Sequence, residues 1–530
     1  MLVVTAAQMQ GLDRRTIDGL GLPGMVLMEA AGRCAVEAMR LQFGPPTGYR
    51  ALVVCGKGNN GGDGYVIARH LTHHGANTEI VALAKVDQLQ GDALANARIC
   101  QRLAIPICEL AGVADLSALE QLAARSDVIV DAIFGTGLQR PAGGHYAEAI
   151  RIMNDSDRPV IAVDIPSGLF ADSGSIPGPA VTAALTVTFG LPKIAHVTQP
   201  AAERCGKIAV ADIGIPPAFA ADIAPRTELL DSGCLARLRS ARRPGSHKGN
   251  YGHLLIVAGS PGKLGAAMLA ARAALTMGTG LVTVGLPASL NVAFEASVTE
   301  AMSLPLPETA DGCLAERAAD RIEEFLARVT ALALGPGLST APESVRVVHR
   351  LVANRIRPVV IDADGLNALQ AAPELLTPNS AAEPMVLTPH PGEMSRLTGM
   401  TTADIQNQRL DCARQFAAQR GAHLVLKGAG TVIAAPDGRA FINPTGNPGM
   451  ATGGSGDVLT GIIGSLLAQA MPLPEAACAA VYLHGAAADL AVADRPMWNL
   501  TAGEIVAHLG QAALRLPTDQ PSPWLTFLNG

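Results

Sequence analysis

The sequence predicts an α/β protein of two domains, each built on a largely parallel sheet. Short apolar runs, such as residues 128–130, 254–259 and 358–363, alternate with Ala- and Leu-rich segments of helical length. Continuous apolar strands separated by helices are typical of parallel sheets that helices cover on both faces. The chain of 530 residues also exceeds the ~250 to 300 residues at which a single core usually stops growing. We therefore expect two cores.

The weakest secondary-structure pattern lies at residues 215–226, with the sequence IPPAFAADIAPR. Proline and alanine interrupt any apolar periodicity there. We place the domain boundary in this segment, which predicts a first domain over residues 1–222 and a second over residues 223–530.

The composition favours a globular cytoplasmic protein over a nucleic-acid or membrane protein. The net charge is −6, and only 16% of the residues are charged, so no nucleic-acid footprint is evident. The nine cysteines form no C-x-x-C pair, which indicates free thiols in a reducing cytoplasm. Gly, Thr and Pro interrupt the uncharged stretches at residues 273–294 and 458–474. We therefore expect buried α/β elements there and no membrane span.

A glycine-rich segment, KGNNGGDG at residues 57–64, follows a β-branched run and precedes a helical pattern at residues 65–73. The order of strand, loop and helix is typical of sites that hold nucleotide phosphates at a helix N-terminus. Side-chain oxygens of Asn59, Asn60 and Asp63 suit a hard cation or ribose hydroxyls better than a bare pyrophosphate.

The same segment contains the glycine spacing of a dinucleotide fingerprint, which raises a hydride-transferring oxidoreductase as one alternative. Such an enzyme would carry an acidic residue at the end of its second strand. Here the strand predicted at residues 78–84 is followed by Lys85, and Asp87 comes late. The sequence therefore disfavours the oxidoreductase.

A second glycine-rich segment, NPTGNPGMATGGSGD at residues 443–457, precedes an apolar helical run at residues 458–468. Glycines let the backbone approach an anion closely, and the helix start adds aligned N–H groups and a positive dipole end. Asp457 then stands where a general base can accept a proton during phosphoryl transfer. Two alternatives stay open from this segment alone: Asp457 is only a helix N-cap, or the domain is a kinase of a small alcohol.

The motifs of both halves together resemble two known enzyme families. The first half is similar to the NAD(P)H-hydrate epimerase family through KGNNGGDG, DAIFGTG at residues 131–137 and VDIPSG at residues 163–168. The second half resembles the ADP-dependent NAD(P)H-hydrate dehydratase family, which has a ribokinase-like fold, through SHKGNYGH (246–253), GPGL (335–338), DADGLN (362–367), TPHPGE (388–393), KGAGT (427–431) and residues 443–457. Their fusion resembles the family of bifunctional NAD(P)H-hydrate repair enzymes.

For the first domain, which would be Rossmann-like, the resemblance implies a pocket for hydrated NADH or NADPH with a potassium ion beside it. Asn60, Asp131 and Ser167 would hold the ion. The substrate would contact Asn59, Asn60, Gly61, Gly62, Asp63, Gly135, Thr136, Gly137, Leu138, Gln139, Arg140, Pro141, Tyr146 and Asp164. Asp164 follows a buried strand and is our candidate for acid/base work at C6 of the hydrated ring. An Asx-turn cap on Ser167 and Gly168 is the structural alternative, and a non-catalytic binding module is the functional one.

For the second domain, the resemblance implies dehydration of the S hydrate to NAD(P)H at the expense of ADP and Mg²⁺, giving AMP and phosphate. Asp457 would deprotonate the C6 hydroxyl. The hydrate pocket would contain Ala266, Gly337, His390 and Asp457, and ADP would contact Lys427, Gly428, Ala429, Gly430, Thr431 and Gly456. A buried structural role for His390 is the alternative. His247 and Lys248 could face phosphate or lie in a solvated loop. We also expect a homo-oligomer with small-molecule ligands and neither a nucleic-acid nor a membrane partner.

Overall fold

The computed structural model describes residues 1–530 except 111, 113–115, 223–225, 240–241, 378–382, 515–521, 523 and 529–530. Contacts divide the chain into two compact units. The first unit contains residues 2–228 together with the C-terminal strand β19 (Leu525–Phe527), and the second extends from Leu229 through helix α19 (Ala502–Leu514). The predicted boundary between residues 222 and 223 falls beside a segment outside the described residues.

The sheet of the first unit has the order β19-β8-β7-β6-β5-β2-β3-β4. All neighbours are parallel except β19, which pairs antiparallel with β8. The other strands are β2 (Arg50–Cys55), β3 (Asn77–Ala82), β4 (Ile107–Glu109), β5 (Val128–Ala132), β6 (Val160–Val163), β7 (Leu185–Phe189) and β8 (Lys207–Ala211). Val54 lies opposite Asp131, and Asp131 opposite Ala162, so the ends of β2, β5 and β6 meet at one edge.

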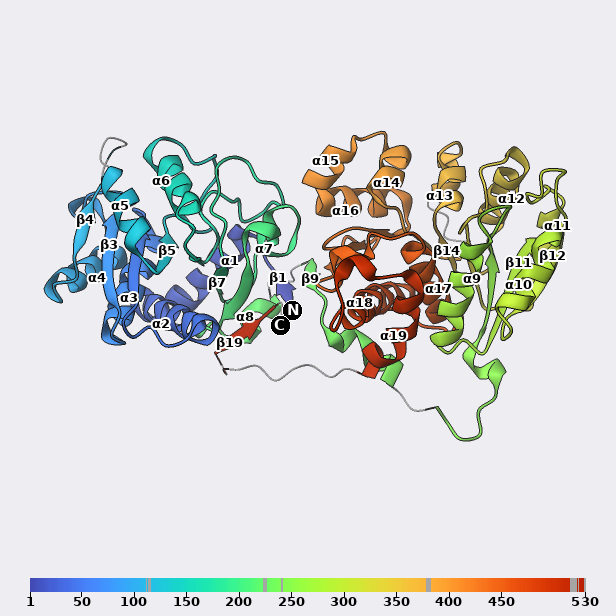
Figure 1. Ribbon diagram of the computed structural model, residues 1–530, viewed down its shortest axis with the longest axis horizontal. Helices are drawn as coiled ribbons and strands as arrows, with labels where there is room; N and C mark the ends of the chain where they lie inside the picture. Colours follow the sequence, from blue (N-terminus) through green and yellow to red (C-terminus); the bar gives the residue numbers. More distant parts are fainter. Residues whose placement is uncertain are drawn as a thin grey trace. The chain divides into compact units, whose positions relative to one another are not determined.

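Helices cover both faces of this sheet (Figure 1). Residues of α2 (Gly24–Phe43), α3 (Asn59–His73) and α4 (Gly91–Arg102) pack with Val53 and Val130 on one face. Residues of α5 (Ser117–Arg125) and α6 (Gly144–Asp155) pack with Leu52 and Ile129 on the other. This alternation of neighbouring strand residues between two cores is expected for buried parallel strands. The remaining helices are α1 (Ala6–Arg14), α7 (Ile194–Val197) and α8 (Pro217–Asp222).

The second unit contains a sheet with the order β18-β17-β16-β15-β14-β13-β10-β11-β12. Its strands are parallel except β17 and β18, which continue antiparallel from β16. They are β10 (His253–Val257), β11 (Leu281–Pro287), β12 (Met302–Leu306), β13 (Ala331–Leu334), β14 (Val359–Ile361), β15 (Met385–Leu387), β16 (His423–Leu426), β17 (Val432–Ala434) and β18 (Ala440–Ile442). Where the chain passes between the units, β1 (Leu2–Val3) pairs antiparallel with β9 (Thr227–Leu229).

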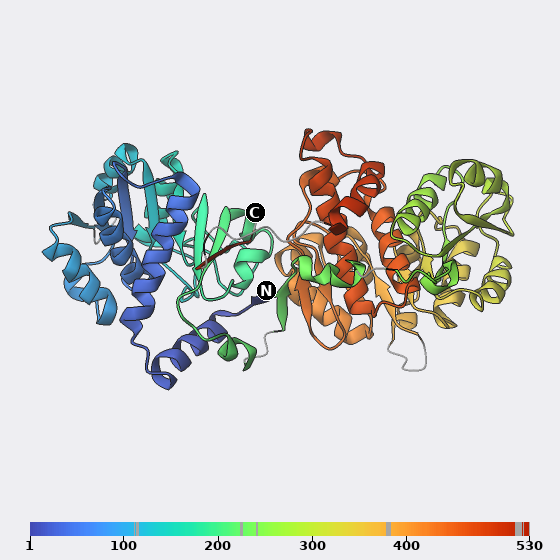
Figure 2. The same ribbon diagram turned by 90° about the horizontal axis from the view of Figure 1, so that it is seen from below.

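One core of the second unit lies between this sheet and a layer of Ala- and Leu-rich helices, which Figure 2 shows from below. The layer consists of α9 (Leu264–Thr276), α17 (Ser455–Ala468), α18 (Leu473–Ala491) and α19. The other helices are α10 (Asn291–Ser297), α11 (Ala318–Leu326), α12 (Pro342–Ala353), α13 (Asp364–Leu369), α14 (Pro391–Thr398), α15 (Thr402–Asn407) and α16 (Arg409–Arg420). The predicted α/β class with largely parallel sheets is confirmed.

The segment at residues 57–64 was predicted as a loop, but α3 already begins at Asn59. Its glycines allow close packing, since a Cβ on Gly61 would lie 2.1 Å from the Gly56 carbonyl oxygen.

Strand β19 belongs to the first unit, although residues 223–530 were predicted to form the second domain. The prediction missed this because a three-residue strand gives no local sign of its distant partner. The stretches at residues 273–294 and 458–474 form buried α/β elements as expected, and no described helix is long and apolar enough to cross a membrane.

Two helical glycines provide a test of this packing. A Cβ on Gly461 of α17 would lie 2.2 Å from the Ala270 carbonyl oxygen of α9, whereas a Cβ on Gly510 of α19 would have open space. We expect Gly461→Ala to destabilise the protein by about 1–3 kcal/mol through overpacking. Gly510→Ala should stabilise it by about 0.5–1 kcal/mol through helix propensity. Thermal midpoints of the two variants and the wild type check this. Equal midpoints would contradict the close approach of α9 and α17.

Candidate active sites

A cavity of about 980 Å³ lies at the carboxyl ends of the strands of the first unit. Its walls include α1, the start of α3, the loop after β5 and the residues that follow β6 and β7. Of the predicted substrate residues, it is lined by Asn59, Asn60, Asp63, Gly135, Thr136, Gly137, Leu138, Gln139, Arg140, Tyr146 and Asp164. Gly61, Gly62 and Pro141 are not among its lining residues; a Cβ on Gly62 would meet Met28.

The Asp164 side chain of this cavity is held by two side-chain hydrogen bonds. It follows β6 and has a positive φ of 65°, a strained conformation that occurs mainly where the surrounding structure enforces it. Its Oδ1 accepts hydrogen bonds from Lys193 Nζ at 2.6 Å and from Thr188 Oγ1 at 3.0 Å. Burial alone would raise the pKa of Asp164, but the Lys193 ammonium lowers it below its usual value. The carboxylate therefore stays ionised, and no side-chain bond from it caps Ser167, so the Asx-turn alternative is wrong.

Lys193 is a candidate functional residue that the sequence analysis missed, since it lines the cavity and bonds to Asp164. Its side chain is 1% exposed, and its ammonium also donates to Thr188 Oγ1 and to the Phe189 carbonyl oxygen. The sequence offered one signal, a single lysine shortly after the buried run at residues 185–189. Asp13 of α1 also lines the cavity, and nothing in its local sequence indicated that.

Of the three predicted potassium ligands, Asn60 lines the cavity, whereas Asp131 and Ser167 are not among its lining residues. Asp131 is fully buried and accepts three hydrogen bonds, from Ser167 Oγ at 2.6 Å, Ser167 N at 2.8 Å and Ile133 N at 3.2 Å. Burial nevertheless raises the pKa of Asp131 to about 6. Asn60 is nearly buried, and its Oδ1 lies 3.1 Å from the position of a Cβ on Gly135. A side chain at position 135 would therefore require the Asn60 amide to move by a few tenths of an ångström.

These donors fit a monovalent hard cation. They are carboxylate, hydroxyl and amide oxygens, which such ions prefer. Among the described residues, Asp131 has no ion-pair partner, and the Asn60 amide nitrogen has no hydrogen-bond partner. In the described part of the chain, no group of three or more His, Cys, Asp or Glu side chains could hold a metal, so a site of several carboxylates is not available.

In the second unit, Asp457 lies in the first turn of α17, which begins at Ser455. The helix N-cap is Gly454, with φ of 91°, and it has no side-chain cap. The interpretation of Asp457 as the N-cap is therefore wrong. Burial raises the pKa of Asp457 to about 6, with a further contribution from the charge of Asp362. A carboxylate with such a pKa is mostly ionised at neutral pH and is well placed to accept a proton.

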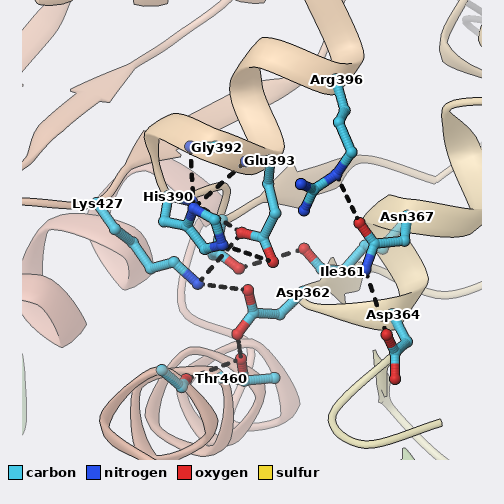
Figure 3. A network of polar contacts seen from close by, with 12 residues as sticks. Ile361, Asp362, Asp364, Asn367, His390, Gly392, Glu393, Arg396, Lys427 and Thr460 are labelled. Carbon is cyan, nitrogen blue, oxygen red and sulfur yellow. Dashed lines mark hydrogen bonds and ion pairs between the residues drawn. The ribbon is translucent and has the colours of Figure 1, made fainter. Parts of the chain in front are cut away.

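Lys427 lies between Asp362 and Glu393 in a network of polar contacts (Figure 3). Its Nζ lies 2.6 Å from Asp362 Oδ1 and 3.8 Å from Glu393 Oε2, and Thr460 Oγ1 donates to Asp362 Oδ2 at 2.8 Å. Burial lowers the pKa of Lys427, but the two carboxylates raise it by more, so the pKa lies above its usual value. A Cβ on Gly456 would lie 3.3 Å from this ammonium. The structure therefore joins two of the predicted ADP residues, Lys427 and Gly456, beside Asp362.

Asp362 was not selected from the sequence, although it begins the DADGLN motif. It follows β14 and is 1% exposed. The next residue, Ala363, has a positive φ of 50°, which is strained for a residue with a Cβ. The burial of this aspartate and the backbone strain at the residue after it are visible only in the structure.

His390 caps α14 from a half-exposed position. The ring atom Nδ1 accepts hydrogen bonds from Gly392 N at 3.0 Å and Glu393 N at 3.3 Å. The backbone N–H of His390 donates to Glu393 Oε2. Because 52% of its side chain is exposed, the buried structural alternative is wrong. Partial burial lowers the pKa of His390, so the neutral imidazole can accept both bonds.

The remaining predicted residues form two small groups. Ala266 and Gly337 are neighbours, since a Cβ on Gly337 would lie 3.2 Å from the Ala266 Cβ. In the loop at residues 428–431, Gly428 and Gly430 have positive φ angles, and Thr431 Oγ1 donates to the Gly428 carbonyl oxygen. His247 caps the short helix at Lys248–Tyr251.

Comparisons with known proteins bear on both units. A family model described as NAD(P)H-hydrate dehydratase matches residues 254–509, and one described as YjeF-related protein N-terminus matches residues 24–195. A Moorella thermoacetica protein named bifunctional NAD(P)H-hydrate repair enzyme Nnr is 46% identical over 510 residues, 96% of each chain. An Escherichia coli protein of the same name is 36% identical and covers 91% of this chain and 88% of its own.

A solved structure described as ADP/ATP-dependent NAD(P)H-hydrate dehydratase from Bacillus subtilis, co-crystallised with ATP and Mg²⁺, is 35% identical. It covers 54% of this chain and 97% of its own, with a TM-score of 0.48.

The buried pair in the first unit can be tested by its effect on stability. Lys193→Met should leave the Asp164 carboxylate buried without a counter-charge, and breaking a buried pair costs about 3–5 kcal/mol. The free energy of unfolding in urea at pH 7 should fall accordingly. An unpaired buried carboxyl has a raised pKa, so this variant should regain stability as the pH falls and Asp164 becomes protonated.

The double variant Lys193→Met/Asp164→Asn is the control, because it removes the buried charge altogether. It should be more stable than Lys193→Met at pH 7. If both variants unfold at the same urea concentration, Lys193 is not what compensates the charge of Asp164.

Proposed function

The chain belongs to the family of bifunctional NAD(P)H-hydrate repair enzymes, and we propose that each of its two units carries one of the two activities. The first unit epimerises the R and S forms of NAD(P)HX, in which the nicotinamide ring is hydrated at C6. The second unit is ribokinase-like and converts S-NAD(P)HX to NAD(P)H with ADP, giving AMP and phosphate. The observation that carries this proposal is the match of bifunctional relatives over 96% of the chain, together with a polar site in each unit.

In the second unit, we assign the role of general base to Asp457. Its carboxylate accepts the proton of the C6 hydroxyl, and the hydroxyl oxygen then takes the terminal phosphoryl group of ADP. AMP is the leaving group of this transfer. The C6–O bond then breaks and phosphate leaves with its electron pair, while C5 loses a proton to solvent, which restores the ring double bond. Positioning and electrostatic stabilisation account for most catalysis of phosphoryl transfer. The Lys427 ammonium, 2.6 Å from Asp362, supplies positive charge beside Gly456.

The other ligands of this unit follow from the same assignment. Ala266, Gly337 and His390 would contact the hydrate, and the loop from Lys427 to Thr431 would contact the ADP phosphates. The positive φ angles of Gly428 and Gly430 support a backbone that presents its N–H groups to an anion. Mg²⁺ bound to ADP would neutralise part of the phosphate charge.

In the first unit, Asp164 acts on the C6 hydroxyl of the substrate, and Lys57 and Arg140 supply cations for its phosphates, since both line the cavity. We assign a potassium ion to Asn60, Asp131 and Ser167. The support is the fit of their oxygens and the buried carboxylate of Asp131, which has no counter-charge among the described residues. When bound, the ion would order the start of α3 and the loop at residues 135–141.

Two further expectations belong to this proposal. A cytoplasmic location agrees with the cysteines, none of which forms a disulfide in the described part of the chain. The homo-oligomeric state and the lack of a nucleic-acid partner stay predictions.

The role of Asp457 is tested by Asp457→Asn, which keeps the size of the side chain and removes the base. We expect dehydration to fall by ~10² to 10⁴, while epimerisation stays near the wild-type rate because its site lies in the other unit. In the wild type, the dehydration rate should fall as the pH drops below about 6, where Asp457 becomes protonated. Comparable loss of both activities in a folded variant would contradict two separate sites.

The ion site is tested by Asp131→Ala, with isomer-resolved chromatography of R- and S-NADHX in potassium and in a large-cation buffer. We expect the variant to bind the hydrate weakly and to epimerise it slowly, because the only charged ligand is gone. Dehydration should be intact. Unchanged epimerisation, or occupancy of the site by magnesium in a crystal, would overturn the assignment.

A further inference from the structure

The cavity of the first unit has an unusual set of charged side chains. Its walls carry the acidic residues Asp13, Asp63, Asp92 and Asp164 and the basic residues Lys57, Arg140 and Lys193. Lys193 is the cation next to Asp164, and its three hydrogen bonds go to Asp164, Thr188 and Phe189. All the hydrogen bonds of this ammonium therefore go to Asp164 and its neighbours, and a second carboxyl group of the same cavity forms no ion pair with a described residue.

Asp13 is that second carboxyl group. Met9, Asp13 and Ile17 follow one another at four-residue intervals on α1 and its π-helical continuation (Arg15–Gly19), and all three line the cavity. Met9 is buried and reaches the turn after β7, since a Cβ on Gly190 would lie 2.8 Å from its Cε. The helix is thus fixed against the turn that leads to Lys193. No hydrogen bond or ion pair links the Asp13 carboxyl group to another described residue.

We propose that Asp13 is the proton donor of the epimerase and that Asp164 is the proton acceptor, an inference that rests on the proposed function of this unit. Asp13 protonates the C6 hydroxyl, the C6–O bond breaks, and water leaves with that electron pair. The N1 lone pair forms the N1=C6 bond. Water then adds to the opposite face of C6, the electron pair returns to N1, and Asp164 accepts the released proton. Exchange with solvent returns one proton from Asp164 to Asp13.

The surroundings of the two carboxyl groups support these roles of proton donor and proton acceptor. Burial raises the pKa of Asp13 to about 6, with Lys193 lowering it and Asp164 raising it. The pKa of Asp164 is shifted in the opposite direction by the adjacent ammonium. Two titratable groups whose pKa values are pushed apart are the usual basis of an acid and a base in one site. Asp63 is the rival donor, but burial and the charges of Asp164 and Asp13 raise its pKa well above the ordinary value, which makes it a weaker acid.

The test compares full-length wild type with Asp13→Asn, Asp63→Asn and Asp18→Asn. Asp18 lies on the same segment but is exposed and does not line the cavity, so it is the matched control. Conversion of R- to S-NADHX is followed by chromatography in saturating potassium, with the reaction without enzyme subtracted, from pH 5 to pH 8. Dehydration by the same preparations reports that each variant is folded.

We expect the wild-type kcat for epimerisation to fall as the pH rises above about 6, because Asp13 loses its proton. Asp13→Asn should lower kcat by at least ~10², remove this alkaline limb and change KM little, since the amide keeps the size of the carboxyl group. Asp18→Asn should match the wild type, and Asp13→Glu should recover part of the rate.

Two results would overturn the inference: an Asp13→Asn variant that keeps the wild-type rate and alkaline limb, or loss of that limb in Asp63→Asn alone. Failure of the wild type to interconvert the isomers is a different outcome, because it would refute the proposed function of the unit itself.

Discussion

In both units, a carboxylate at the end of a parallel strand is paired with the ammonium of one lysine. Asp164 follows β6 and lies 2.6 Å from Lys193, and Asp362 follows β14 and lies 2.6 Å from Lys427. Each turn carries a positive φ at a residue with a Cβ, at Asp164 itself and at Ala363. Such backbone strain persists only where the surrounding contacts enforce it, and the ion pair is one of the contacts at each turn.

The pairs also set the protonation of their neighbours. Near each pair, burial raises the pKa of a second carboxyl group, and the lysine only partly opposes this shift. Asp13 beside the first pair and Asp457 beside the second both have a pKa raised to about 6. The same arrangement therefore yields an ionised carboxylate and a carboxyl group that titrates near neutral pH, which is the combination that acid/base chemistry requires.

Glycines allow these charged groups to meet. A Cβ on Gly135 would lie 3.1 Å from Asn60 Oδ1 and 3.4 Å from Asp164 Oδ2, and a Cβ on Gly456 would lie close to both Lys427 and Asp362. Side chains at these positions would crowd the charged and amide groups around them. Gly56 and Gly61 allow close contacts of the backbone in the same way. A Cβ on either residue would lie about 2 Å from a carbonyl oxygen.

The sequence by itself determined the α/β class, the two cores, the glycine-rich segments and the aspartates that follow strands. These features depend on apolar periodicity and turn residues, which are properties of residues close together in the chain. It identified Asp164 and Asp457 from their positions after a strand and at the start of a helix. It did not reveal that α3 begins at Asn59, or that β19 returns to the first sheet.

Only the tertiary structure decided which charges compensate one another. Lys193 reaches Asp164 across 29 residues and Lys427 reaches Asp362 across 65, and Asp13 enters the cavity from a helix at the start of the chain. A pKa depends on burial and on charges within a few ångströms, and folding alone brings those charges together.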